Sequence, residues 1–269
     1  MAFTHLLARR DGAVEHLTLN RPGVRNAFNE EMIDELSEWA ISRHADLTIR
    51  AVVLRGAGSV FSAGGDLSWM ARTVGYTRDQ NLRDAEALAQ MYRRLDTLPF
   101  PLIGCVHGAA LGGGSGLAAV CDIVIAARDA VFGFTEVRLG IVPAIISPYV
   151  VAKIGPSAAR ELFLTGARFS AERAREIGLV HAVVESGALE DDVRRAVDGV
   201  LASGPQAVAA AKALIRHAAA GPLAETTGLA AEVLADARVS AEGQEGLRAF
   251  LEKRRAAWRA DEGPERGRP

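Results

Sequence analysis

Hydrophobic residues along the chain follow two spacings, one typical of buried strands and the other of amphipathic helices. Short apolar runs, namely "VEHLTLN", "RAVVLRG", "PLIGCVHG", "IVIAA" and "LVHAVV", predict strands buried in a sheet. Between the first two runs, "NEEMIDELSEWAISRHA" places Met32, Ile33, Leu36, Trp39 and Ala40 on one helical stripe. The alternation predicts an α/β fold whose strands are covered on both faces.

Capping residues and prolines set the expected ends of the other helices. Asn29 is placed to cap the first helix, and Ser170 to cap a later one, "SAERAREIG". A long helix is predicted from Arg78 to Leu98, where Pro99 ends it. The inner face of this long helix is expected to carry Leu82, Ala85, Ala89, Tyr92 and Leu95.

The chain divides by pattern into a core and a helical appendage. From about Leu189 onward the sequence is almost wholly helical in pattern and rich in alanine. We therefore expect a core over residues 1–195 and a helical region over 196–260. The charged, Pro- and Gly-containing segment 261–269 is predicted to be disordered.

Composition narrows the class of protein. The formal net charge of −2 gives no general attraction to nucleic acid or to an anionic membrane, so neither is expected as a partner. The chain has no apolar run long enough to span a membrane and no signal-peptide pattern, which predicts a cytoplasmic protein. Its two cysteines, Cys105 and Cys121, lie in apolar runs and are expected to be reduced core thiols.

The glycine cluster "LGGGSG" lies where a helix should begin after a buried strand. Glycine there lets a ligand approach the unpaired N–H groups of the first helical turn, which favour a negative oxygen. Walker and nucleophile-elbow motifs do not fit, whereas the dinucleotide pattern G-x-G-x-x-A matches Gly114, Gly116 and Ala119. The cluster therefore indicates an oxyanion site, a nicotinamide site, or close packing of a helix on a strand.

A second small-residue loop, "FSAGGDL", also follows a buried strand and offers N–H groups near Ala63 and Gly64. Two convergent N–H donors from separate loops are what a thioester carbonyl requires when it gathers negative charge. The pair of loops therefore favours an oxyanion hole.

Glu136 is the only carboxylate in "AVFGFTEVRLGIVP". Burial among Phe132, Phe134 and Val137 would raise the pKa of its side chain and suit it to proton transfer near neutral pH. Pairing with Arg138 at the surface is the competing interpretation. The histidines lack the spacing of metal ligands, so no metal site is predicted.

Taken together, "FSAGGDL", "HGAALGGGSGLAAVCDIVIAARDAVFGFTEVRLGIVP" and "LTGARFSAERAREIGLV" resemble the enoyl-CoA hydratase/isomerase (crotonase) superfamily over almost the whole chain. The resemblance implies a spiral core of ββα turns, carrying the acyl-CoA site, and a C-terminal helical trimerisation region. It also implies a homotrimer or a dimer of trimers. The segment "PAIISPYVVAKIGPSAARELFLT" looks most like the bacterial methylglutaconyl-CoA hydratases.

The resemblance also assigns roles to residues. The N–H groups of Ala63 and Gly113 would form the oxyanion hole for the thioester oxygen. Coenzyme A would enter as part of the substrate, with no separate cofactor. The residues implied to lie along the CoA are Arg25, Ala27, Ala63, Gly64, Asp66 and Leu67, with Phe250 and Lys253 reaching it from a neighbouring subunit.

One position departs from the family pattern. The resemblance implies that two-glutamate hydratases carry one glutamate at the position of Gly116 and a second at the position of Glu136. This chain has only the second. Hydration of a branched enoyl-CoA with Glu136 as acid and base is the first hypothesis. A Δ3,Δ2-enoyl-CoA isomerase with Glu136 as sole proton shuttle and a non-catalytic acyl-CoA-binding protein are the alternatives. The acyl group, the pathway and the choice between trimer and hexamer stay open.

Overall fold

A six-stranded sheet forms the centre of the molecule in the computed structural model, which describes residues 3–259. The spatial order is β1-β2-β3-β4-β6-β9, with β1 antiparallel to β2 and the other neighbours parallel. The strands are β1 (Leu6–Asp11), β2 (Val14–Leu19), β3 (Ala51–Gly56), β4 (Leu102–Val106), β6 (Ile123–Ala127) and β9 (Ala182–Val184). All five strand runs predicted from the sequence are present, whereas β1 was not anticipated.

A second, three-stranded sheet lies beside the first and was also missed from the sequence. It consists of β5 (Ala109–Leu111), β7 (Val131–Gly133) and β8 (Arg168–Ser170), in the order β5-β7-β8. Strands of three residues are too short for an alternating pattern to show. This small sheet matters because β5 leads into the glycine cluster and β7 leads into Glu136.

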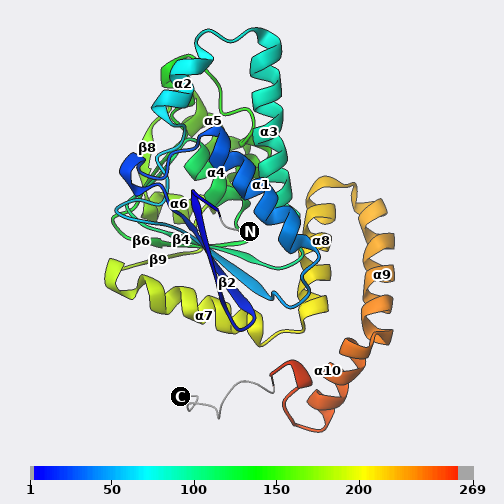
Figure 1. Ribbon diagram of the computed structural model, residues 1–269. Coiled ribbons are helices and arrows are strands. Elements are labelled where there is room, and N and C mark those ends of the chain that lie inside the picture. Colours follow the sequence, from blue (N-terminus) through cyan, green and yellow to red (C-terminus); the bar gives the residue numbers. More distant parts are fainter. Residues whose placement is uncertain (1–2, 260–269) are drawn as a thin grey trace.

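Helices cover both faces of the large sheet, as expected (Figure 1). On one face lie α1 (Glu30–His44), α3 (Arg78–Asp96), α4 (Gly113–Val120) and α5 (Ser147–Thr165), and on the other lies α7 (Leu189–Leu201). Alternate residues of β3 serve the two cores: Val52 and Leu54 face the first group of helices, and Ala51 and Val53 face α7. The remaining helices of the core are α2 (Leu67–Thr73), α6 (Ala171–Glu176) and the short 3-10 segments η1 (Pro22–Val24), η2 (Glu136–Leu139) and η3 (Ser186–Ala188).

The predicted helix caps are confirmed, and one predicted inner face is wrong in part. Asn29 accepts a hydrogen bond from Met32 N–H, and Ser170 from Arg173 N–H. In α3, Tyr92 and Leu95 are fully buried, but Leu82 is 45% exposed. The first turns of α3 extend past the sheet, so that only its C-terminal half packs on the core.

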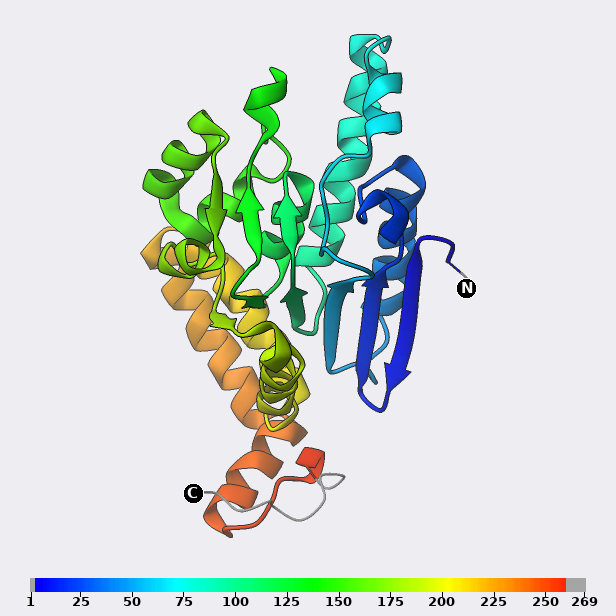
Figure 2. The same ribbon diagram turned by 90° about the vertical axis from the view of Figure 1, so that its left-hand side faces the viewer.

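Three helices follow α7 and stand beside and below the core (Figures 1 and 2). They are α8 (Pro205–Ala220), α9 (Leu223–Val239) and α10 (Ala241–Leu251), and the 3-10 segment η4 (Ala257–Arg259) follows. Lys212 Nζ of α8 donates to Asp122 Oδ2 at 2.7 Å and to Phe100 O at 3.1 Å, which anchors α8 to the core. The predicted boundary at residue 195 falls inside α7, and the tail 261–269 lies outside the described residues.

The cysteines, the apolar helices and the possible metal ligands were also the subject of predictions from the sequence. Both cysteines are buried, and burial raises the pKa of Cys105 to about 11 and that of Cys121 to about 12. Among residues 3–259, no helix combines the length and apolar character that crossing a bilayer requires. The same residues contain no group of three or more His, Cys, Asp or Glu side chains arranged to hold a metal ion.

Candidate active site

In the loop "FSAGGDL" the N–H group of Gly65 has no hydrogen-bond partner among the residues that the structure describes, and it is not the amide that was predicted. Ala63 N–H donates to Arg25 O at 2.9 Å, so the assignment of Ala63 as an oxyanion donor is wrong. At Gly64 the chain takes φ +90°, a conformation suited to glycine. Gly65 lies opposite Phe28 in a parallel β-bridge, in which Phe28 N–H donates to Gly64 O and Asp66 N–H donates to Phe28 O. The N–H of Gly65 itself takes no part in this bridge and points away from Phe28. Gly65 N–H donates no hydrogen bond within residues 3–259.

The glycine cluster begins α4, as predicted, and Gly113 is its first helical residue. A Cβ atom on Gly113 would lie 2.8 Å from Cε2 of the Phe28 ring, and one on Gly114 would lie 2.5 Å from Ser62 O. Glycine at position 113 therefore admits the Phe28 ring against the helix, and glycine at position 114 admits the loop 61–67. Gly113 N–H has no hydrogen-bond partner in the described part of the chain. It therefore lies at the positive end of α4, free to donate to a ligand.

Glu136 approaches the same helix end from the small sheet. Its Oε1 lies 3.2 Å from where a Cβ on Gly112 would stand, and Gly112 N–H donates to Gly133 O at 2.8 Å. Its Oε2 is buried without a hydrogen-bond partner among the described residues. Burial raises the pKa of the Glu136 carboxyl, as expected from its apolar surroundings. No ion pair with Arg138 forms in the described structure, which leaves the carboxylate available for proton transfer.

The space beside Gly116, where two-glutamate relatives carry their first glutamate, is filled. A Cβ atom on Gly116 would lie 2.3 Å from Ile146 Cγ2 and 2.9 Å from the Tyr92 hydroxyl. Tyr92 and Ile146 are themselves buried, at 0% and 3% exposure. Gly116 therefore lies next to the site, and this backbone arrangement has no room for a side chain there.

The predicted CoA-contacting residues of the core lie around the free Gly65 amide. Arg25 is exposed with φ +56°, Ala27 is buried, and Leu67 is 82% exposed. The Asp66 carboxylate already has partners within the protein. It accepts hydrogen bonds from Ser68 N–H and Trp69 N–H at the start of α2, and it forms an ion pair with Arg21 at 2.9 Å. Although burial opposes the effect, these hydrogen bonds lower the pKa of Asp66. Its carboxylate therefore shapes the loop and is not free for a ligand.

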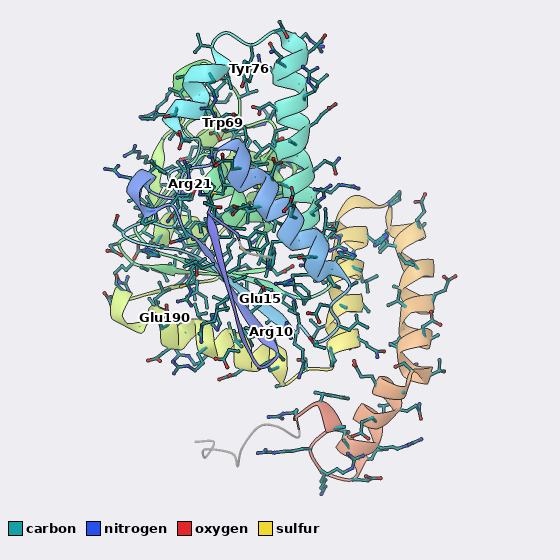
Figure 3. All side chains as sticks on the ribbon, viewed as in Figure 1. Arg10, Glu15, Arg21, Trp69, Tyr76 and Glu190 are labelled. Carbon is teal, nitrogen blue, oxygen red and sulfur yellow. The ribbon has the colours of Figure 1, made fainter. Side chains whose placement is uncertain are left out.

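Two apolar side chains of α2 lie next to Gly65. A Cβ on Gly65 would lie 3.3 Å from Met70 Sδ and 3.8 Å from Trp69 Cζ3. The Trp69 indole donates to Asp84 Oδ1 at 3.4 Å, which ties α2 to α3. Figure 3 shows Trp69 at the same end of the molecule as Tyr76 and above Arg21.

Phe250 and Lys253 are not brought to this site within one chain. Phe250 belongs to α10, which lies at the opposite end of the molecule from α2 in both ribbon views (Figures 1 and 2). There Phe250 and Lys253 line a hollow together with Arg254, Arg255 and Trp258. Their predicted contact with CoA therefore requires a second subunit.

Three residues of the site escaped the sequence analysis. The sequence analysis named Ala63 and Gly64 and left out Gly65, because which N–H of a loop is free depends on the hydrogen bonds that the loop makes with other segments. Tyr92 was identified only as a core residue of its helix, and Ile146 was not singled out. Tyr92, Gly116 and Ile146 lie far apart along the chain. A local sequence pattern therefore could not predict that they meet.

The chain is similar to known proteins over nearly its full length. The enoyl-CoA hydratase/isomerase family model matches residues 9–261. The 2,3-dehydroadipyl-CoA hydratase of Escherichia coli K12 is 33% identical over 254 residues, covering 93% of this chain and 97% of that protein. AtuE of Pseudomonas aeruginosa has a similar structure, with a TM-score of 0.92, 40% identity, and coverage of 95% of this chain and 99% of that one. An enoyl-CoA hydratase from Shewanella pealeana gives a TM-score of 0.91 at 38% identity, covering 95% and 96%.

Two amides without a partner in residues 3–259 and a buried carboxylate oxygen, near the start of a glycine-rich helix on this α/β fold, define an enzyme of acyl-CoA chemistry. The chain belongs to the enoyl-CoA hydratase/isomerase family, also called the crotonase superfamily. The expected fold class, an α/β core followed by C-terminal helices, is confirmed.

Proposed function

We propose that this protein is a hydratase of a branched, 3-methylglutaconyl-like α,β-unsaturated acyl-CoA, with Glu136 as both acid and base. The observation that carries the proposal is the buried Oε2 of Glu136, which has no partner among the described residues and lies at the open end of α4. An unsatisfied buried carboxylate oxygen is costly, so its retention favours a role with a ligand. Homologues named as enoyl-CoA and dehydroadipyl-CoA hydratases support addition of water.

In the proposed reaction, Gly65 and Gly113 donate their N–H groups to the thioester oxygen. Glu136 takes a proton from water, whose oxygen bonds to the β-carbon while the double-bond electrons move toward the thioester. The oxygen then carries the negative charge of an enolate, which the two fixed amides stabilise. Glu136 returns a proton to the α-carbon, which completes the addition of one water molecule.

The rest of the substrate is coenzyme A. Arg25 and Leu67 are exposed on the two segments beside the Gly65 amide and would contact its adenine and pantetheine parts, whereas Ala27, Gly64 and Asp66 are buried and would hold those segments in place. Phe250 and Lys253 would reach the same CoA from a neighbouring copy of the chain in a homotrimer or a dimer of trimers.

A second candidate is isomerisation of a β,γ-unsaturated acyl-CoA. It is favoured by the filled space beside Gly116, which leaves Glu136 as the carboxylate at this site. Here Glu136 would remove a proton from the α-carbon and return it to the γ-carbon while the double bond moves between them. The same two amides would stabilise the enolate.

The absorbance of the conjugated thioester tests both candidates. Straight, branched and 3-methylglutaconyl-CoA substrates would be compared with a β,γ-enoyl-CoA, using the wild type, Glu136→Gln, and Glu38→Gln on the exposed surface of α1 as a matched control. We expect loss of absorbance with branched enoyl-CoAs that only Glu136→Gln abolishes. Gain of absorbance with the β,γ-enoyl-CoA alone would indicate an isomerase. Binding without turnover of any substrate would indicate a non-catalytic acyl-CoA-binding protein.

A further inference from the structure

A buried tyrosine hydroxyl touches the peptide backbone of the candidate oxyanion site. Tyr92 Oη of α3 donates to Gly113 O at 2.6 Å, a short hydrogen bond to the residue whose N–H is free. The same hydroxyl lies 3.1 Å from where a Cβ on Gly113 would stand. A single side chain thus reaches the first turn of α4 from a different helix.

Tyr92 is held so that its hydroxyl stays in this position. Its side chain is fully buried, and its ring centroid lies 5.9 Å from that of Tyr149. Burial is the main cause that raises the pKa of Tyr92 well above its usual range, with smaller contributions from the nearby charges of Glu136 and Tyr149. The hydroxyl is therefore protonated at neutral pH and able to donate.

Gly116 completes the arrangement. The Tyr92 hydroxyl and Ile146 Cγ2 occupy the volume that a side chain at position 116 would enter, so a glutamate there would require both side chains to move. The hydroxyl has instead a backbone carbonyl to bind, and that carbonyl belongs to Gly113.

We infer that Tyr92 is a positioning residue: by binding the carbonyl oxygen of Gly113 it fixes the backbone of that residue, so that the N–H on the other side of its Cα faces the thioester oxygen. The tyrosine hydroxyl does this from the volume that two-glutamate relatives give to a carboxylate. The inference rests on the proposed function, since it assumes that a thioester binds at the two amides. Tyr92 itself contacts neither water nor the acyl group in this role. It acts on the reaction through the geometry of α4.

The test measures polarisation of a bound thioester as well as turnover. A para-hydroxycinnamoyl-CoA probe absorbs at longer wavelength when hydrogen bonds draw charge onto its thioester oxygen. The proteins compared would be the wild type, Tyr92→Phe, and Tyr149→Phe as a matched control that alters a neighbouring tyrosine. Dissociation constants of the probe and thermal midpoints would be recorded for each.

For Tyr92→Phe we expect the probe to bind with little change in affinity but with most of the red shift lost. Turnover should fall about tenfold in kcat, the size of effect that one neutral hydrogen bond gives, while KM changes little. Tyr149→Phe should retain both the red shift and kcat. Incorporation of 3-fluorotyrosine at position 92, a stronger donor, should increase the red shift and serves as the second variant if Tyr92→Phe folds poorly.

Two different failures can be told apart. An unchanged red shift and kcat in Tyr92→Phe, with a lower thermal midpoint, would overturn the inference and leave Tyr92 as a packing residue. Absence of any red shift in a wild-type protein that binds the probe would overturn the proposed oxyanion hole and the role of Tyr92 with it. Absence of probe binding to the wild type would contradict the proposed function itself.

Discussion

At the scale of single residues, the site is distinguished by polar groups that have no hydrogen-bond partner within the described residues. Ala63 N–H is used inside the protein, whereas Gly65 N–H, Gly113 N–H and Glu136 Oε2 have no partner within the described residues. A buried carboxylate oxygen without a partner is rare in folded proteins, and the two unpaired amides lie in the segments beside it. The sequence pattern singled out Glu136 as a lone carboxylate and the glycine cluster as a helix start, and the family resemblance assigned the oxyanion role to Gly113. It misplaced the other amide, since hydrogen bonding depends on contacts with Arg25 and Phe28.

The raised pKa of Glu136 makes a prediction about pH. The base must be ionised to take a proton from water, so the rate should fall as pH decreases through the pKa of Glu136. Because burial raises that pKa, the acid limb of the kcat profile should lie above 4.5, the ordinary value for a glutamate. Steady-state rates at saturating substrate, with circular dichroism at each pH to confirm folding, check this. A kcat that stays level down to pH 4.5 would contradict it.

At the scale of elements, helices were predicted well and short strands poorly. The stripe of α1 and its cap at Asn29 are local features, which a sequence pattern can carry. Strands β5, β7 and β8 have three residues each, and β1 is mostly exposed, so neither set shows a usable period. The close approach of α4 to the start of α5, where Gly116 meets Ile146, is likewise invisible in the sequence.

This approach of α4 to α5 predicts a coupled pair of substitutions. Gly116→Ala should lower the free energy of unfolding by about 1–3 kcal/mol, because the added methyl overlaps Ile146. Ile146→Ala should lower it by about 2–5 kcal/mol through a cavity. The double variant should lose less than the sum of the two, since each change makes room for the other.

Urea unfolding of the two single variants and the double variant measures the coupling. Gly199→Ala in α7 is the matched control, because a Cβ there meets no atom within 4 Å. It should leave stability unchanged or slightly raised. Additive losses in the double variant would contradict the predicted overlap.

At the scale of the whole molecule, the last three helices expose large apolar side chains out of proportion to their length. Large exposed side chains on α8, α9 and α10 are Ile215, Leu223, Leu234, Val239, Leu247, Phe250 and Leu251. Apolar surface gathered in this way usually marks an interface between proteins. It agrees with the trimerisation role that the family resemblance implies for this region, which stays a prediction.

Sedimentation analysis should therefore give about three or six times the 28.5 kDa mass of the chain. Ile215→Glu on α8 and Leu234→Glu on α9 should shift the protein toward smaller species and raise KM for acyl-CoA, because Phe250 and Lys253 would no longer reach a neighbour's site. Leu47→Glu, at an 86% exposed position after α1, is the control and should change neither. A monomeric wild type with full activity would contradict the predicted assembly.

The segment from Phe134 to Ile146 combines two features described separately above. It carries Glu136, the proposed proton-transfer group, and also Ile146, which fills the volume beside Gly116. The two amides come from other parts of the chain, the loop at Gly65 and the helix α4. Changes confined to this one contiguous stretch could therefore alter which bond is made or broken, while the proposed oxyanion donors, which lie on other segments, stay unchanged.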